Sequence, residues 1–264
     1  MGAAIEFREI GFTTAQGDLL LDSISLRLEE GSATVLLGRS GSGKTTLLRT
    51  VNRMIEATAG SVIVEGKPAL ERDVIALRRG IGYVIQETGL FPHLTIERNV
   101  GLVLEAQGRP KAERVERSRA LLQEVGLDPA RYATRYPYQL SGGQRQRVGL
   151  ARALAADPPI LLMDEPFGAL DPLTRAEMQD MLRGLLAGMH KTVLLVSHDL
   201  NEALYLADTI VLMEKGRVVA RLSPREFLVS EEAAVVEYVR AYYRGAEKQG
   251  TEEQHAEKQK AALP

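Results

Sequence analysis

Hydrophobic and polar positions alternate near the start of the chain. Between residues 5 and 28 apolar side chains recur mostly at every second position, with polar residues between them. Such alternation buries one face of a strand and leaves the other in solvent. It predicts strands of an antiparallel sheet, with residues 11–18 as the loop between them.

Further along, short apolar runs without alternation indicate buried strands. They are separated by stretches of helical periodicity, so the pattern favours an α/β core. The predicted strands are Ala33–Leu37, Gly60–Gly66, the run that ends at Ile85, Ile160–Met163, Thr192–Val196, Thr209–Met213 and Arg217–Leu222.

From residue 87 to about residue 157 the sequence pattern is typical of helices. Within this interval, residues 111–125 carry apolar side chains among many charges, as an amphipathic helix would. We interpret 87–157 as a helical subdomain inserted into an α/β core that spans 1–244. A further helix over 232–243 has one apolar face and is expected to dock, whereas the charged tail 245–264 is expected to be disordered.

One glycine-rich stretch carries the first chemical signal. Residues 38–45 match the phosphate-binding pattern G-x-x-x-x-G-K-[ST], after an apolar strand and before a helix predicted over Lys44–Ile55. Glycines let backbone N–H groups surround a phosphate at the positive end of that helix. Lys44 would reach the β- and γ-phosphates, and the Thr45 hydroxyl would hold Mg²⁺. The candidate cofactor-binding residues of this stretch are Gly38, Arg39, Ser40, Gly41, Ser42, Gly43, Lys44, Thr45 and Thr46.

Two adjacent carboxylates, Asp164 and Glu165, follow the apolar strand predicted over Ile160–Met163. Adjacent strand residues point to opposite faces unless the strand bends, so the two acids can take different roles. With a phosphate loop upstream, Asp164 can support Mg²⁺ and Glu165 can face the water that attacks the γ-phosphate. The alternative is a strand that simply ends in two solvated acids.

The string Leu-Ser-Gly-Gly-Gln at residues 140–144 opens another helix. Ser141 and Gln144 fit a capping box, which would begin a helix in any protein. The paired glycines go beyond the needs of a cap, because they expose backbone N–H groups at a positive helix end. The sequence therefore offers a second candidate anion site, made of Ser141, Gly142, Gly143 and Gln144.

The composition limits the possible functions. The formal net charge is -2 with a pI near 6.2, so the charge gives no argument for nucleic acid as a partner. The absence of cysteine excludes disulfides and cysteine-based metal sites. The start of the chain has no visible secretory signal, and no apolar run approaches the roughly 18 residues that span a bilayer. Any membrane role is therefore expected to need another chain.

Together these motifs resemble those of the ATP-binding subunit of ABC transporters. The resemblance extends from residue 38 to residue 198. The matching motifs are the phosphate loop at 38–45, the Q-loop glutamine at Gln86, the LSGGQ motif at 140–144, the Walker B strand and its glutamate at 160–165, the D-loop at 169–171 and the switch histidine at His198.

The resemblance implies a P-loop core with a parallel sheet, an N-terminal antiparallel β subdomain and an inserted helical subdomain. It also implies a head-to-tail homodimer that holds ATP and Mg²⁺ between the phosphate loop of one chain and residues 141–144 of the other. His198 would contact the γ-phosphate, Gln86 would sense Mg²⁺ and the attacking water, and Asp171 would cross the interface. The implied catalytic residues are Glu165, His198 and Gln86, and the implied metal ligands are Thr45, Gln86 and Asp164.

One family feature is missing, namely the aromatic residue on which adenine usually stacks. The family pattern places Thr14 or Ala15 at that position. Phe12 is the only aromatic residue nearby, so Phe12 is taken as the residue that contacts the base.

A narrower resemblance concerns the transported solute. Residues 51–56, 82–86, 89–93 and 165–175 are similar to segments of osmoprotectant importers, which carry glycine betaine, choline or related quaternary amines. The resemblance implies a cytoplasmic ATPase at the inner face of the cell membrane. Its partners would be transmembrane permease subunits and an extracytoplasmic substrate-binding protein. Many members append a regulatory pair of CBS domains, which this chain is not expected to hold.

Two other assignments share the ATP motifs. An exporter or lipid-transport cassette differs only in the weaker similarity around the Q-loop. Soluble ABC-type ATPases of translation, DNA repair or cluster assembly generally carry two cassettes or long coiled-coil insertions, and the sequence shows neither. An importer therefore remains the favoured interpretation.

Overall fold

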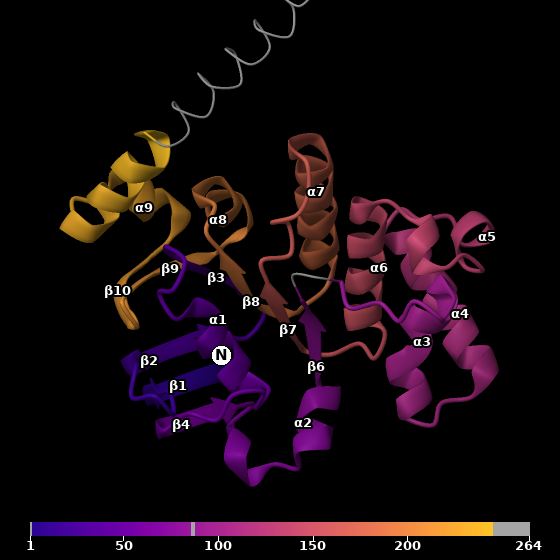
Figure 1. Cartoon of the computed structure of the whole chain (residues 1–264), viewed down its shortest axis with the longest axis horizontal. Helices are drawn as coiled ribbons and strands as arrows, with labels where there is room; N and C mark the ends of the chain where they lie inside the picture. Colours follow the sequence, from indigo (N-terminus) through magenta and orange to yellow (C-terminus); the bar gives the residue numbers. More distant parts are fainter. Residues whose placement is uncertain (1, 86–87, 245–264) are drawn as a thin grey trace, which may run out of the picture.

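The computed structural model describes residues 2–85 and 88–244, which form two sheets and their surrounding helices (Figure 1). The predicted role of Gln86 and the predicted disorder of 245–264 lie outside the described residues and stay predictions. Among the described helices, none combines the length and the apolar character that a bilayer crossing requires.

An antiparallel sheet contains the N-terminal strands in the order β2-β1-β4-β5. Its strands are β1 (Ala3–Thr13), β2 (Leu19–Glu29), β4 (Ala59–Val64) and β5 (Lys67–Pro68). The alternating pattern is thus confirmed, but the loop is shorter than the predicted 11–18. Phe12 still pairs with Leu21, and Thr13 with Leu19, so the strands continue almost to the turn.

A second sheet has the order β10-β9-β3-β8-β7-β6. The pairs from β9 to β6 are parallel, and only the edge strand β10 is antiparallel to its neighbour. Every apolar run predicted for this core is a strand: β3 (Ala33–Leu37), β6 (Ile81–Val84), β7 (Ile160–Asp164), β8 (Thr192–Ser197), β9 (Thr209–Glu214) and β10 (Arg217–Leu222). Because β3, β7 and β8 run in parallel, their carboxyl ends meet at one edge, where open α/β sheets place their ligands.

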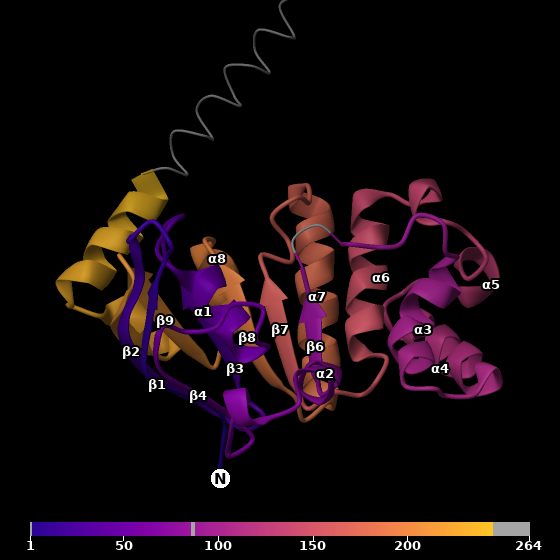
Figure 2. The same ribbon diagram turned by 60° about the horizontal axis from the view of Figure 1, so that its bottom comes forward.

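Helices cover both faces of this sheet. Helix α1 (Lys44–Val51) ends earlier than the predicted Ile55, because Asn52 is its C-cap and Arg53 takes a left-handed backbone with φ of 54°. The remaining helices are α2 (Val74–Arg79), α3 (Ile96–Ala106), α4 (Lys111–Glu124), α5 (Pro129–Tyr132), α6 (Gly142–Leu154), α7 (Pro172–Gly188), α8 (Leu200–Leu206), α9 (Pro224–Val229), the helical residues 233–244, and the short 3₁₀ helices η1 (Ala69–Glu71) and η2 (Pro137–Gln139). Helices α3 to α6 occupy the interval predicted as helical, on the side of α7 that faces away from α1 (Figures 1 and 2).

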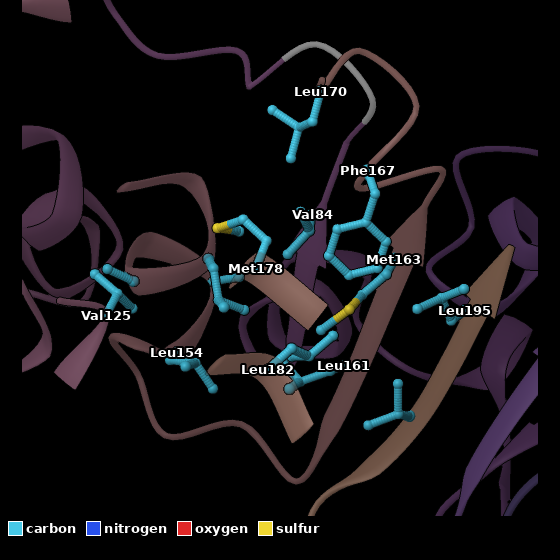
Figure 3. Close-up of a cluster of buried hydrophobic side chains, with 14 of the residues drawn as sticks. Val84, Val125, Leu154, Leu161, Met163, Phe167, Leu170, Met178, Leu182 and Leu195 are labelled. Carbon is cyan, nitrogen blue, oxygen red and sulfur yellow. The ribbon is translucent and has the colours of Figure 1, made fainter. Parts of the chain in front are cut away.

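Two hydrophobic clusters lie on opposite faces of the parallel sheet. Leu194 and Val196 of β8 belong to the cluster shared with α1 and the antiparallel sheet, whereas Val193 and Leu195 belong to the other. Both faces of the strand are therefore buried, which explains its unbroken apolar sequence. In the second cluster Phe167 packs near Met163 just after β7, so the chain beyond the strand is held against the core (Figure 3).

Candidate functional site

The phosphate loop joins β3 to α1 and curls around the side chain of Lys44. The Lys44 side chain is only 4% exposed, and its Nζ donates to the carbonyl oxygens of Gly38 and Arg39, both at 2.8 Å. Burial lowers the pKa of Lys44, while the charges of Glu165 and Asp164 act in the opposite direction. A positive charge is thus enclosed at the amino end of a helix, an arrangement that favours an anion.

Gly43 is required by the local geometry. It is the N-cap of α1 with φ of 96°, a left-handed conformation that L side chains rarely adopt. An added Cβ would also lie 2.7 Å from the carbonyl oxygen of Leu20. The loop therefore packs directly against β2, and Leu20 joins residues 40–46 and Glu165 around one cavity.

The first turn of α1 is tied to the end of β7 by a partly buried hydrogen bond. Thr45 Oγ1 donates to Asp164 Oδ1 at 2.7 Å, and Arg49 Nη2 donates to Asp164 Oδ2 at 3.2 Å. The Tyr83 hydroxyl lies at 3.5 Å from the same Oδ2 atom, and Asp164 is 4% exposed. Hydroxyl and carboxylate oxygens are ligands of the kind that Mg²⁺ prefers. No group of three His, Cys, Asp or Glu side chains within 2–85 and 88–244 could hold a metal by itself, so other oxygens would have to complete the coordination.

Glu165 and His198 face each other at the rim of the loop. The Nδ1 atom of His198 lies 3.4 Å from Oε2 of Glu165, and the His198 side chain is 60% exposed. The strand bends after Asp164, because Glu165 takes a φ of 46° while its N–H donates to the Val196 carbonyl. The two carboxylates therefore separate, as the sequence allowed: Asp164 points into the α1 contact and Glu165 into the open cavity.

The LSGGQ residues begin α6 through a complete capping box. Ser141 Oγ accepts from the Gln144 N–H at 3.3 Å, and Gln144 Oε1 accepts from the Ser141 N–H at 3.0 Å. A Cβ on Gly143 would lie 2.4 Å from Cγ2 of Thr174, so Gly143 is needed for packing against α7. A Cβ on Gly142 would meet nothing within 4 Å. Capping and packing contacts thus account for Ser141, Gly143 and Gln144 but not for Gly142.

The two candidate anion sites are separate within one chain. In both views α6 and α1 lie on opposite sides of α7, and the described cavities beside the phosphate loop contain no residue of 141–144 (Figures 1 and 2). Asp171 is exposed and caps α7, with its Oδ1 accepting from the Thr174 N–H at 3.0 Å. Hydrogen bonds from the hydroxyl and the backbone of Thr174 lower the pKa of Asp171.

Phe12, the residue proposed to contact the base, does not line the cavities described beside the phosphate loop. Phe12 is half-buried and packs against the cluster beneath the antiparallel sheet. Leu20 contributes to one of these cavities instead. The role of Phe12 therefore stays a prediction.

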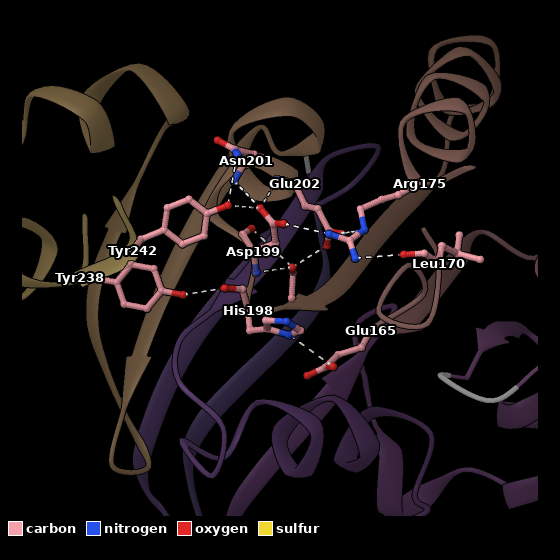
Figure 4. A network of polar contacts seen from close by, with 10 residues as sticks. Glu165, Leu170, Arg175, His198, Asp199, Asn201, Glu202, Tyr238 and Tyr242 are labelled. Carbon is pink, nitrogen blue, oxygen red and sulfur yellow. Dashed lines mark hydrogen bonds and ion pairs between the residues drawn. The ribbon is translucent and has the colours of Figure 1, made fainter. Parts of the chain in front are cut away.

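The sequence missed two tyrosines near the site. Tyr238 and Tyr242, from the helical segment 233–244, line a cavity together with Glu165 and His198 (Figure 4). The apolar face of this segment predicted that it docks, and Val235 is indeed fully buried. Periodicity alone could not identify the surface that receives it.

Comparison with known proteins agrees with this geometry. The profile of the family described as ABC transporter matches residues 21–168. The choline transport ATP-binding protein OpuBA of Bacillus subtilis is 44% identical over 224 residues, which cover 85% of this chain and 58% of that protein. The osmoprotectant import ATP-binding protein OsmV of Salmonella typhimurium is 48% identical over 79% of this chain and 54% of its own length. The chain thus spans a little over half the length of these curated relatives.

One solved structure with the same fold is a dimer of its own chain. It is the dimeric post-hydrolysis state of the ATP-binding cassette MJ0796, bound to ADP and Pi. It aligns with a TM-score of 0.75 and 34% identity over 84% of this chain and 99% of that one.

Proposed function

The chain belongs to the ABC transporter family, and from that premise we propose that it is the ATP-hydrolysing subunit that powers import of an osmoprotectant. The observation that carries the proposal is the meeting of three elements at one sheet edge. The phosphate loop after β3, Glu165 after β7 and His198 after β8 line one cavity. Asp164, the last residue of β7, accepts a hydrogen bond from Thr45 at the start of α1. Such a site has the parts that phosphoryl transfer to water requires.

Each side chain has a distinct role in the proposed reaction. Bound ATP with Mg²⁺ would supply the phosphoryl group and a metal that stabilises its developing charge. Lys44 and the loop N–H groups would bind the phosphates, while Thr45 and Asp164 would hold the metal. Glu165 would orient the attacking water and accept its proton. His198 would contact the γ-phosphate and hold the Glu165 carboxylate, from which its Nδ1 lies 3.4 Å away. Outside the described residues, we propose Gln86 as the sensor of metal and water.

A second copy of the chain is part of the proposal. Two separate anion-binding helix ends in one chain exceed the needs of one triphosphate. A head-to-tail dimer would place Ser141, Gly142, Gly143 and Gln144 of one copy over the phosphate loop of the other. The dimeric state of the similar cassette supports this arrangement.

The solute and the membrane partners are proposed from the relatives. Two proteins with 44% and 48% identity are named for choline transport and osmoprotectant import. We therefore assign glycine betaine, choline or a related quaternary amine as the solute. Transmembrane permease subunits at the inner face of the cell membrane and an extracytoplasmic binding protein would complete the system.

The segment after Gln86 offers a contact surface for a permease. Phe91 is 43% exposed and its ring lies edge-on to His93, while Leu90 is half-buried beside them. We call Leu90, Phe91 and His93 the docking patch. Phe91 exposes an aromatic ring here, whereas Leu90 also packs against the core, and we propose that the exposed ring contacts the permease.

The backbone under the docking patch is held firmly. The fully buried Asn99 accepts from the Phe91 N–H at 2.8 Å and donates to the Phe91 and Leu94 carbonyls. Arg152 of α6 donates to the carbonyls of Thr88 and Gly89, both at 2.7 Å. A displacement of α6 would therefore move the patch with it, which supports a route from the nucleotide to the permease.

Uptake in cells tests the proposed function. In a strain that lacks this subunit, expression of the wild-type chain should restore uptake of labelled glycine betaine or choline after an osmotic upshift, and the Glu165→Gln variant should not. If the purified wild-type chain did not hydrolyse ATP, the proposed ATPase activity itself would be rejected. Unchanged solute uptake in the deletion strain would reject only the solute class.

A further inference from the structure

The helical segment 233–244 contacts the loop that carries His198 (Figure 4). We call residues 197–199 the switch loop. The Tyr238 hydroxyl donates to the backbone carbonyl of His198 at 3.0 Å, and the Tyr242 hydroxyl donates to Asp199 Oδ1 at 2.7 Å. Two hydroxyls, one helical turn apart, thus bind consecutive residues of the loop.

The other side of the switch loop is fixed from within the core. Ser197 Oγ donates to Glu202 Oε2 at 2.6 Å and accepts from the Asp199 N–H at 2.9 Å. Both Ser197 and Glu202 are buried. His198 therefore lies between a buried hydroxyl–carboxylate pair and the two tyrosines, while its own side chain contacts Glu165.

Asp199 extends the network toward the D-loop. Its carboxylate caps α8 through the Asn201 N–H at 2.8 Å, and Arg175 Nη1 donates to its other oxygen at 3.5 Å. The same guanidinium donates to the carbonyl of Leu170 at 3.2 Å, the residue before Asp171. Contacts therefore run without a gap from Tyr242 to the proposed dimer interface.

We propose that Tyr238 and Tyr242 are positioning residues that hold His198 against Glu165 and join the switch loop to the D-loop. This inference rests on the proposed function. It assigns the C-terminal helical segment a part in hydrolysis, because its two hydroxyls fix the peptide that carries the switch histidine. Both tyrosines line the cavity beside the phosphate loop, but their hydroxyls donate to the switch loop and not to the phosphate loop, so removal of a hydroxyl should leave the phosphate contacts intact.

The protonation of both tyrosines suits this role. Burial raises the pKa of Tyr238 to about 12, and burial also raises the pKa of Tyr242. Both side chains are therefore neutral hydroxyls at physiological pH and can donate the observed hydrogen bonds.

Phenylalanine variants of the full chain test the inference. Tyr238→Phe and Tyr242→Phe each remove one hydroxyl and keep the ring. Loss of one such hydrogen bond should lower kcat for ATP hydrolysis roughly three- to tenfold. The dissociation constant for ATP should stay within about twofold of wild type, since phosphate-loop contacts are untouched. The control is Tyr243→Phe, because Tyr243 is 46% exposed and no hydrogen bond of its hydroxyl occurs within the described residues.

Each outcome is decisive. A lower kcat with unchanged ATP affinity and melting temperature, absent in Tyr243→Phe, supports positioning. Unchanged kcat in both variants, or a loss that parallels weaker ATP binding or a lower melting temperature, overturns it. A wild-type chain without ATPase activity would instead reject the proposed function, so the two failures are distinguishable.

Discussion

Glu165 combines a left-handed backbone with a carboxylate that faces an open cavity. A non-glycine residue in this conformation costs about 1–3 kcal/mol, and such residues cluster at functional sites. The bend separates Glu165 from the buried Asp164 beside it. In the proposed reaction Glu165 would act on water, and Asp164 would hold the metal.

Glu165→Gln should lower steady-state ATP hydrolysis by about 10²–10⁴, because a general base is lost while no phosphate contact is removed. The measurement is phosphate release together with the ATP dissociation constant, which should not change. If the variant kept more than a tenth of wild-type turnover, Glu165 would not be the base.

Lys44→Ala should instead weaken ATP binding itself. The ammonium group lies inside the phosphate loop, within 2.8 Å of two of its carbonyls, so its removal takes the positive charge from the loop. Titration with a fluorescent ATP analogue measures the effect, with Lys111→Ala on α4 as the control. Equal affinity of the Lys44 variant and wild type would contradict the assignment.

Glu202 should contribute a pH dependence of folding. Burial raises the pKa of Glu202 above its ordinary 4.5. The folded chain then binds this proton more tightly than the unfolded chain, so the contribution to stability falls as pH rises through and above 4.5. In Glu202→Gln the free energy of unfolding in urea should decline less steeply over that window. An identical slope in both chains would show that Glu202 does not titrate as described.

At the scale of elements, the sequence predicted the features that depend on local pattern. The apolar runs of β3, β7 and β8 and the capping box of α6 were identified because periodicity and capping are local. The end of α1 at Val51 and the continuation of β1 to Thr13 were not, because neighbouring residues and strand pairing decide element ends.

The contacts around the site that sequence analysis did not predict share one feature, which is a long separation along the chain. Tyr238 and Tyr242 reach the switch loop from about forty residues further along the chain, at separations of 40 and 43. Arg152 holds Gly89 across a separation of 63. No local pattern encodes such pairings, so they depend on the assembled fold.

The docking patch gives a prediction about one element. Phe91→Asp should leave ATP hydrolysis by the isolated chain near normal, because the ring is exposed and Asn99 holds the backbone below it. In the assembled transporter the charge should prevent apolar contact and abolish uptake. Ile75→Asp on α2, also an exposed apolar position, is the control. Normal uptake by the Phe91 variant would exclude the patch as the coupling surface.

At the scale of the whole molecule, the central claim is that one chain supplies two halves of different sites. The phosphate loop and the start of α6 lie on opposite sides of α7 (Figure 2). Gly142 presents an open backbone that no packing within the described residues requires. A second copy facing Gly142 would give both observations one explanation.

Light scattering of the Glu165→Gln chain tests this claim most directly. With ATP and Mg²⁺ the molecular mass should double, because hydrolysis no longer separates the two copies. Adding Gly142→Asp should keep the chain monomeric. The new carboxylate has room, suits a helix amino end and would face the partner's phosphates, so folding and ATP binding should persist. An unchanged mass of Glu165→Gln at ATP concentrations far above its dissociation constant, or doubling that persists with Gly142→Asp, would contradict the account.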